Sequence, residues 1–162
     1  MKTDASFKGI LIAGLALLYL APLAFFLTME QRASGAPIGT LVGNGLLLSI
    51  PLLALCGMIY VLATAARQVR SGGALDRRLA GWVYWAPRVA GIVIILFISL
   101  FALDVFTPGV PLGEVLFGLL MHLIPSIVLA VILALAWKWE WIGFWFFLLA
   151  ALLFLLTFLR EA

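Results

Sequence analysis

The chain has little of the chemistry that most catalytic and metal sites need, since its 162 residues include one cysteine and one histidine. The single Cys56 excludes a disulfide within the chain. Without clusters of cysteine or histidine, no zinc or copper site is expected from one copy of the chain. Charged residues are also scarce, at 10% against roughly 25% in soluble domains. The composition therefore excludes a water-soluble domain.

Long apolar runs fill most of the chain, which is 66% hydrophobic. No water inside a bilayer can satisfy stray backbone groups, so such runs predict spanning helices of about 20 residues. The pattern predicts an all-α integral membrane protein that forms a single membrane domain. Its five expected transmembrane helices cover residues 9–28, 41–66, 87–106, 114–137 and 141–159.

In the predicted topology, most of the basic residues lie on the same face of the membrane. Short loops rich in Lys and Arg stay in the cytoplasm, so the amino terminus is expected inside and the carboxyl terminus outside. The net charge of +3 is no sign of nucleic-acid binding, because the basic residues flank membrane spans and meet anionic lipid. The lipid bilayer is the expected partner. Eight of the ten Lys and Arg are on the inner side: Lys2, Lys8, Arg67, Arg70, Arg77, Arg78, Arg88 and Lys138.

A short interfacial helix is expected over residues 74–85. Leu75, Leu79 and Trp82 recur there at helical spacing, opposite Arg77 and Arg78. This arrangement is typical of a helix that lies on anionic lipid, and a docking surface for a cytoplasmic partner is the alternative. All six tryptophans fall on the same inner side, where their amphipathic rings suit the headgroup layer. The predicted lipid anchors are Arg77, Arg78, Trp82, Trp85, Trp137, Trp139 and Trp141.

His122 is the candidate functional residue that lies deepest in the membrane. Placing an imidazole inside a bilayer costs several kcal/mol, so its presence there calls for a structural or functional reason. Ser126 lies one turn further on, and Pro125 leaves the carbonyl of Met121 without its helical partner. The ring could ligate a haem or metal, relay protons, or form a nucleophilic dyad with Ser126. The structural interpretation is a hydrogen bond that joins two helices, to Ser99, Asn44 or the freed carbonyl. No cofactor is predicted, since bis-His ligation of a haem would need a second copy of the chain.

Two acidic residues flank the predicted outer loop between residues 106 and 114. Asp104 ends one helix, and Glu114 opens the next, where a carboxylate favours the helix N-terminus. Capping and solvation explain both residues. Alternatively, they join His122 at the mouth of an outward-facing polar cavity that binds a cation or passes protons. The members of this possible polar site are Asp104, Glu114, His122, Asn44 and Ser126.

The second half of the chain contains the motifs "YWAPR", "LFISLFALDVF", "MHLIPS" and "AWKWEWIG". Together they resemble a family of small uncharacterised prokaryotic membrane proteins, catalogued as a domain of unknown function. The resemblance covers about residues 84–160, and residues 1–73 look like an added helix pair. It implies a three-helix module in a prokaryotic cytoplasmic membrane, with Asp104, His122 and the "WKWEW" turn as recurring features. It brings no activity with it.

Three functions are compatible with this pattern. The first is a non-enzymatic accessory or assembly subunit of a membrane complex, which would bind protein partners or further copies of itself. The alternative is a small ion or solute transporter or channel component, with its outward-facing polar site at Asp104, Glu114 and His122. The third is an intramembrane redox subunit in which His122 becomes a ligand in a dimer.

Overall fold

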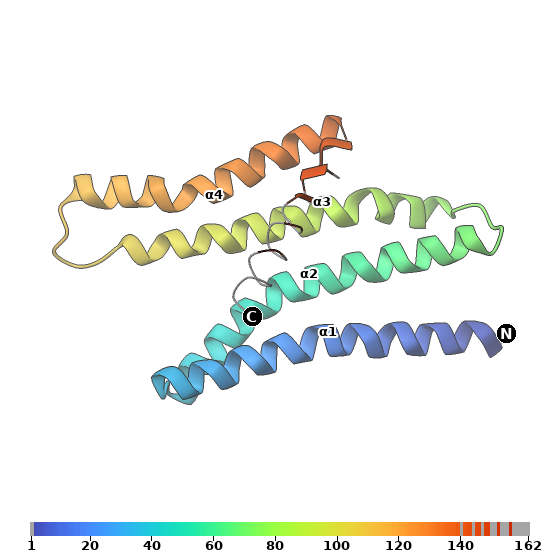
Figure 1. The fold of residues 1–162 in the computed structure, drawn as a ribbon, viewed down its shortest axis with the longest axis horizontal. Helices are drawn as coiled ribbons and strands as arrows, with labels where there is room; N and C mark the ends of the chain where they lie inside the picture. The colour runs from blue at the N-terminus through green and yellow to red at the C-terminus, as the bar shows by residue number, and fades with distance from the viewer. Residues whose placement is uncertain are drawn as a thin grey trace. The chain divides into compact units, whose positions relative to one another are not determined.

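Four long helices and one short 3-10 helix form the described part of the chain in this computed structural model (Figure 1). The structure describes residues 2–139, 141–143, 145–146, 148–149, 152 and 156. No strand occurs among them, so the all-α prediction is confirmed for this part. The elements are α1 (Lys2–Ser34), α2 (Ile38–Arg70), α3 (Arg77–Leu100), η1 (Phe101–Val105) and α4 (Leu112–Lys138).

Each of the four long helices, with η1 continuing α3, is long and apolar enough to cross a membrane. The spans contain between 27 and 33 residues, which corresponds to roughly 40–50 Å at 1.5 Å per residue. A hydrocarbon core is only about 30 Å thick, so helices of this length tilt or extend beyond it. The fifth predicted helix, over residues 141–159, lies largely outside the described residues.

The predicted helices are too short at both ends of α1, α2 and α4 and at the start of α3. At these ends the helices continue past the apolar runs into polar flanks. Hydropathy marks only the part of a helix that suits hydrocarbon, whereas backbone hydrogen bonding continues until a residue interrupts it. At the end of α1, Gly35 adopts a φ of +59°, and its N–H bonds to the Gln31 carbonyl at 3.0 Å. Glycine adopts this left-handed conformation without steric cost, and it ends the helix. Pro37 then precedes α2.

The predicted separate helix over residues 74–85 is not seen. Residues 73–76 have no regular structure, and Arg77 begins a helix that continues without a break to Leu100. Pro87 was expected in the first turn of a new helix but lies inside α3. The freed carbonyl that such a proline leaves can be satisfied by other groups, so a membrane helix tolerates it.

The chain forms two compact units, Met1–Phe97 and Ile98–Ala162. In the first, α1 and α2 lie side by side as a hairpin (Figure 1). Tyr19 Oη lies 2.8 Å from Ser49 Oγ. Since the Ser49 hydrogen is donated to the Gly45 carbonyl, Tyr19 is the donor between the helices. The half-buried seam of α1 recurs every fourth residue, at Leu11, Leu15, Tyr19, Leu23 and Leu27.

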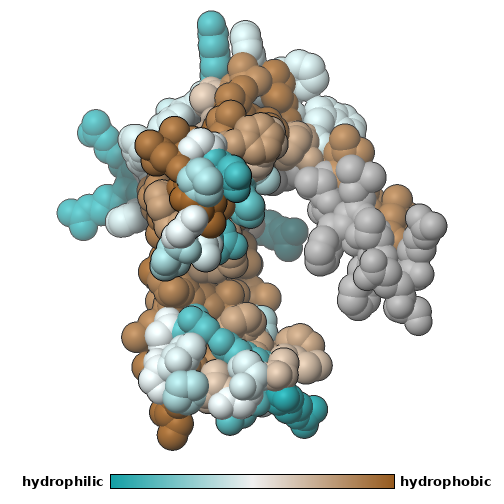
Figure 2. Space-filling view, turned by 90° about the vertical axis from the view of Figure 1, so that its left-hand side faces the viewer, coloured by the Kyte–Doolittle hydropathy of each residue, from teal (hydrophilic) through white to brown (hydrophobic). Residues whose placement is uncertain are grey.

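Few side chains are buried, and the buried apolar ones are small. They are Ala65, Ala90, Ala102 and Val115, and no large side chain of the described residues is fully buried. Figure 2 shows apolar residues over most of the visible surface, with hydrophilic residues in small clusters. Lipid tails are as apolar as leucine, so large side chains in a bilayer need no protein cover.

Candidate functional site

In the second unit, η1 packs closely against α4 at a glycine. A Cβ built on Gly118 would lie 2.7 Å from Cγ1 of Val105, which is closer than real Cβ contacts. Gly118 therefore allows η1 to approach in a way that no other residue would. Asp104, which directly precedes Val105, is placed beside the helical turn of α4 that carries His122.

His122 uses its two ring nitrogens differently. Nδ1 lies 2.9 Å from the Gly118 carbonyl oxygen, and Nε2 lies 3.9 Å from Oδ1 of Asp104. A carbonyl can only accept a hydrogen bond, so Nδ1 carries a proton and donates it. In a neutral ring, Nε2 is then an acceptor that faces a carboxylate oxygen. The two groups attract each other only when a further proton is bound to Nε2 or to the carboxylate.

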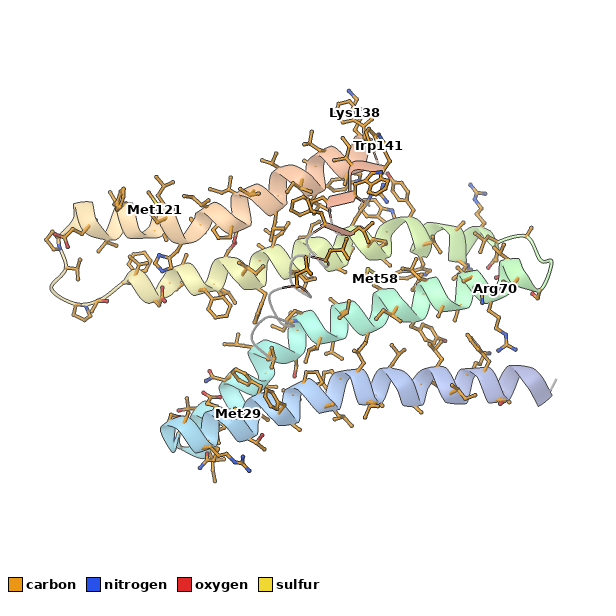
Figure 3. The ribbon with its side chains drawn as sticks, in the orientation of Figure 1. Met29, Met58, Arg70, Met121, Lys138 and Trp141 are labelled. Atoms are coloured by element: carbon orange, nitrogen blue, oxygen red, sulfur yellow. The ribbon has the colours of Figure 1, made fainter. Side chains whose placement is uncertain are left out.

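The Asp104–His122 pair is accessible rather than enclosed. The side chains are 69% and 48% exposed, respectively. A distance of 3.9 Å is too long for a direct hydrogen bond, although one water could bridge it. Met121, the sequence neighbour of His122, is labelled on the first half of α4 in Figure 3. The described residues therefore do not enclose the pair.

The hydrogen bond of His122 differs from the bonds that the sequence suggested. The ring bonds to a carbonyl of its own helix, one turn back, and not to Ser99, Asn44 or the carbonyl freed by Pro125. The described hydrogen bond of His122 therefore lies within α4, and its contact with another element is the 3.9 Å approach of Nε2 to Asp104 on η1. The physical reason is that the i−4 carbonyl is always within reach of a helical side chain, whereas another helix must first be brought near.

Ser126 is buried, and its hydroxyl has no hydrogen-bond partner in the described part of the chain. Although it lies one turn from His122, no hydrogen bond joins the two side chains. Glu114 lies in the first turn of α4, as predicted, where a carboxylate favours the positive end of the helix. Within the described residues, no ion pair links Glu114 to His122.

Asn44 was predicted as a member of the polar site. It belongs to the first unit, whereas Asp104, Glu114, His122 and Ser126 belong to the second. Its side-chain amide donates to Oε1 of Glu30 on α1. The other oxygen of Glu30, Oε2, is buried without a partner among the described residues.

Glu30 is not among the candidate site residues that the sequence suggested. A signal for its pairing was nevertheless available. Glu30 and Asn44 each lie seven residues from Pro37 in the short α1–α2 connection. In two antiparallel helices joined by a short loop, residues equally distant from the loop lie at a similar level along the helix axes.

The predicted membrane anchors are exposed on the helices. Arg77, Arg78, Trp82 and Trp85 are exposed in the first part of α3. Trp137, Trp139 and Trp141 are exposed near the end of α4. Figure 3 labels Lys138 and Trp141 together at that end, and Lys138 Nζ lies 5.1 Å from the centre of the Trp139 ring. Among the described residues, no three His, Cys, Asp or Glu side chains come together in a group that could hold a metal.

The long apolar helices define the chain as a helical membrane protein. A family described as a domain of unknown function, DUF7670, matches residues 76–162, and the chain belongs to this family. The resemblance inferred from the sequence motifs is confirmed, and the match begins at residue 76 rather than at about residue 84. It includes α3, η1 and α4, and therefore both Asp104 and His122. No curated protein and no solved structure matches the chain.

Proposed function

We propose that the chain is a non-enzymatic, multi-pass membrane protein that acts as a small ion or solute transport or channel component. Its site is the Asp104–His122 pair, which binds and releases a proton or binds a small cation. The observation that supports this proposal is the geometry of the imidazole. Nδ1 is occupied by the Gly118 carbonyl, and Nε2 faces the Asp104 carboxylate at 3.9 Å.

The proposed topology has five spans, with the amino terminus in the cytoplasm and the carboxyl terminus outside. The unequal distribution of basic residues supports this orientation. It places η1 and the following loop at the outer surface of a prokaryotic cytoplasmic membrane. The Asp104–His122 pair then faces outward, and Glu114 lies at the same outer end of α4.

Proton binding would control the attraction between η1 and α4. With a proton on Nε2, the imidazolium attracts the Asp104 carboxylate. Without that proton, the nitrogen lone pair faces a negative oxygen and the attraction is lost. Ionisable residues inside a membrane commonly mark ion pathways and proton relays. A half-exposed pair of this kind is better suited to taking up a proton from one side of the membrane than to holding two helices together.

Proton flux into liposomes tests this proposal. The full-length protein would be reconstituted with a pH-sensitive dye inside, and a pH gradient would be applied. The wild type should collapse the gradient faster than empty liposomes, and His122→Gln and Asp104→Asn should return the rate to that of empty liposomes. Arg32→Gln, which removes an exposed charge from the first unit, is the matched control and should leave the rate unchanged. Wild-type liposomes that behave like empty ones would contradict the proposal.

A second candidate is an accessory or assembly subunit of a membrane complex. The observation in its favour is that none of the described large side chains is fully buried. The apolar surface could therefore contact partner helices or further copies of the chain. Affinity purification from native membranes, followed by mass spectrometry, tests this candidate. A stoichiometric partner together with an absence of flux would favour it over the transport component.

A visible absorption spectrum of the same sample would reveal a haem held by His122 in a dimer.

A further inference from the structure

The imidazole of His122 is held in the arrangement that metal-binding histidines use. Its Nδ1 donates a hydrogen bond to the Gly118 carbonyl oxygen at 2.9 Å, so Nε2 of the neutral ring carries a lone pair. A histidine that binds a metal through one nitrogen almost always donates its other N–H to a carboxylate, a backbone carbonyl or water, which fixes the ring. The Gly118 carbonyl therefore prepares Nε2, and not Nδ1, to be a metal ligand.

A second possible ligand faces this nitrogen. Oδ1 of Asp104 lies 3.9 Å from Nε2 of His122, and both atoms carry lone pairs when the ring is neutral. Two such atoms repel each other unless a positive charge lies between them. The close approach of Val105 to Gly118 keeps η1, and with it Asp104, beside α4. The two elements thus bring one nitrogen donor and one oxygen donor together.

The distance between the two donor atoms suits a bridging metal better than a direct hydrogen bond. Zn²⁺ binds an imidazole nitrogen at about 2.0–2.1 Å and a carboxylate oxygen at about 2.0–2.2 Å, which places the two donors roughly 3.4 Å apart around a tetrahedral metal. A direct N–H···O bond needs about 2.9 Å. From the observed 3.9 Å, the metal requires a movement of about half an ångström and the hydrogen bond about twice as much. Two exposed side chains can make the smaller adjustment.

The chemistry of the two donors decides which cation the pair prefers. Mg²⁺ and Ca²⁺ select oxygen ligands, whereas Zn²⁺ and neighbouring divalent transition metals accept imidazole together with carboxylate. We propose that Nε2 of His122 and the carboxylate of Asp104 bind a divalent transition-metal cation such as Zn²⁺. This inference rests on the cation-binding form of the proposed function and names the class of cation.

Two protein ligands form an open site, in which water fills the other positions of the metal. The chain has a single histidine and a single cysteine, and no group of three possible ligands occurs among the described residues. Structural zinc sites, by contrast, use four protein ligands. A metal held by two exposed side chains binds weakly and exchanges readily, which suits a site that loads a cation for transport.

Nitrogen NMR of the full-length protein tests this proposal, because His122 is the single histidine of the chain. The protein would be produced without a histidine tag, with isotope-labelled histidine, and placed in nanodiscs. Adding Zn²⁺ should shift the Nε2 resonance and leave Nδ1 protonated, whereas the same concentration of Mg²⁺ should shift neither. The absence of a zinc-dependent shift, or a shift that places Zn²⁺ on Nδ1, would overturn the proposal.

A substitution at Asp104 separates a two-ligand site from metal binding by histidine alone. Asp104→Asn should weaken Zn²⁺ binding by about tenfold or more, since even groups outside the ligand shell commonly change metal affinity by about 10–100-fold. The matched control is Asp76→Asn, which removes one exposed carboxylate from the first unit and should keep the wild-type affinity. Both carboxylates are exposed, so neither substitution removes packing. Equal affinities of the wild type and Asp104→Asn would overturn the proposal.

Failure of this proposal can be distinguished from failure of the proposed function. Proton flux into liposomes without added metal, together with no binding of Zn²⁺, would leave transport standing and overturn the metal site. Binding of Zn²⁺ at the pair, together with no flux of protons or Zn²⁺ into liposomes, would support the metal site and contradict transport.

Discussion

In the first unit, the hydroxyl groups of Tyr19 and Ser49 join α1 to α2, whereas in the second unit His122 bonds to a carbonyl of its own helix. The Glu30–Asn44 bond likewise crosses between α1 and α2. Polar groups of the first unit therefore connect helices. The imidazole of the second unit keeps one nitrogen directed at an exposed carboxylate.

This difference sets hydrogen bonds that join helices apart from the pair for which we propose proton exchange. A hydrogen bond between helices gains from being buried and undisturbed. A group that binds and releases a proton must instead be reached by water, and it must have a partner whose attraction depends on that proton. The Tyr19–Ser49 bond is a part-buried bond between helices, and the second condition is the one that the proposed function requires of the Asp104–His122 pair. The following changes test this contrast.

The largest effect is expected at Gly118, where the close approach of η1 depends on the missing side chain. Gly118→Ala places a Cβ 2.7 Å from Cγ1 of Val105 and should cost about 1–3 kcal/mol of stability, as overpacking does. It should also move Asp104 away from His122. Thermal unfolding in detergent measures the loss, and Val105→Ala in the same chain should restore part of it. Gly113→Ala, where a Cβ meets open space, is the control. Equal stability of both glycine variants would show that the contact is unimportant.

A smaller loss is expected at the Glu30–Asn44 pair. Asn44→Ala removes the amide that donates to Glu30 and leaves both carboxylate oxygens without a partner, which should cost about 1–2 kcal/mol. Glu30→Leu combined with Asn44→Leu removes the polar pair altogether and should be less destabilising than Asn44→Ala alone. A double-mutant cycle in unfolding experiments measures the coupling between the two positions. A coupling of zero would contradict a hydrogen bond between them.

Removing the hydroxyl of Tyr19 should have a modest effect. Tyr19→Phe keeps the ring but loses the donor to Ser49, and hydrogen bonds between membrane helices contribute about 0.6 kcal/mol on average. Ser49 still donates to the Gly45 carbonyl, so no donor is left unsatisfied there. Tyr60→Phe, at an exposed ring of α2, is the matched control. A loss of several kcal/mol from Tyr19→Phe would mean that the α1–α2 contact depends on more than this bond.

The smallest effect on stability is expected at His122. His122→Leu removes a bond within one helix and an exposed pair, so unfolding should change by less than about 0.5 kcal/mol, as for most surface changes. The dependence of the η1–α4 contact on proton binding, which we propose above, should nevertheless disappear. Spin labels placed on η1 and α4 at positions other than 104 and 122 can measure this distance against pH. A large loss of stability in His122→Leu would indicate that the imidazole holds the unit together.

The sequence predicted the helices well and the polar contacts poorly. Apolar runs identified all four described spans, because burial in hydrocarbon requires both apolar side chains and an internally bonded backbone. The ends of α1 and the continuous start of α3 were missed, since hydropathy does not report where hydrogen bonding stops. Asp104 and His122 were singled out because polar groups are conspicuous in an apolar helix, and the structure places their side chains 3.9 Å apart. The bond between Asn44 and Glu30 was not predicted.

By itself, the sequence determined that this chain is a helical membrane protein of its family, and it marked the residues that are costly to place in a bilayer. These properties depend on composition and on the spacing of residues within a single segment, so they can be read from each segment without knowing its neighbours in space. Only the tertiary structure decided which polar groups meet. The Asp104–His122 pair depends on η1 turning back onto α4 at Gly118, and the Glu30–Asn44 bond depends on the register of α1 against α2. Both are contacts between elements, and a short-range pattern contains no information about the distance between two elements.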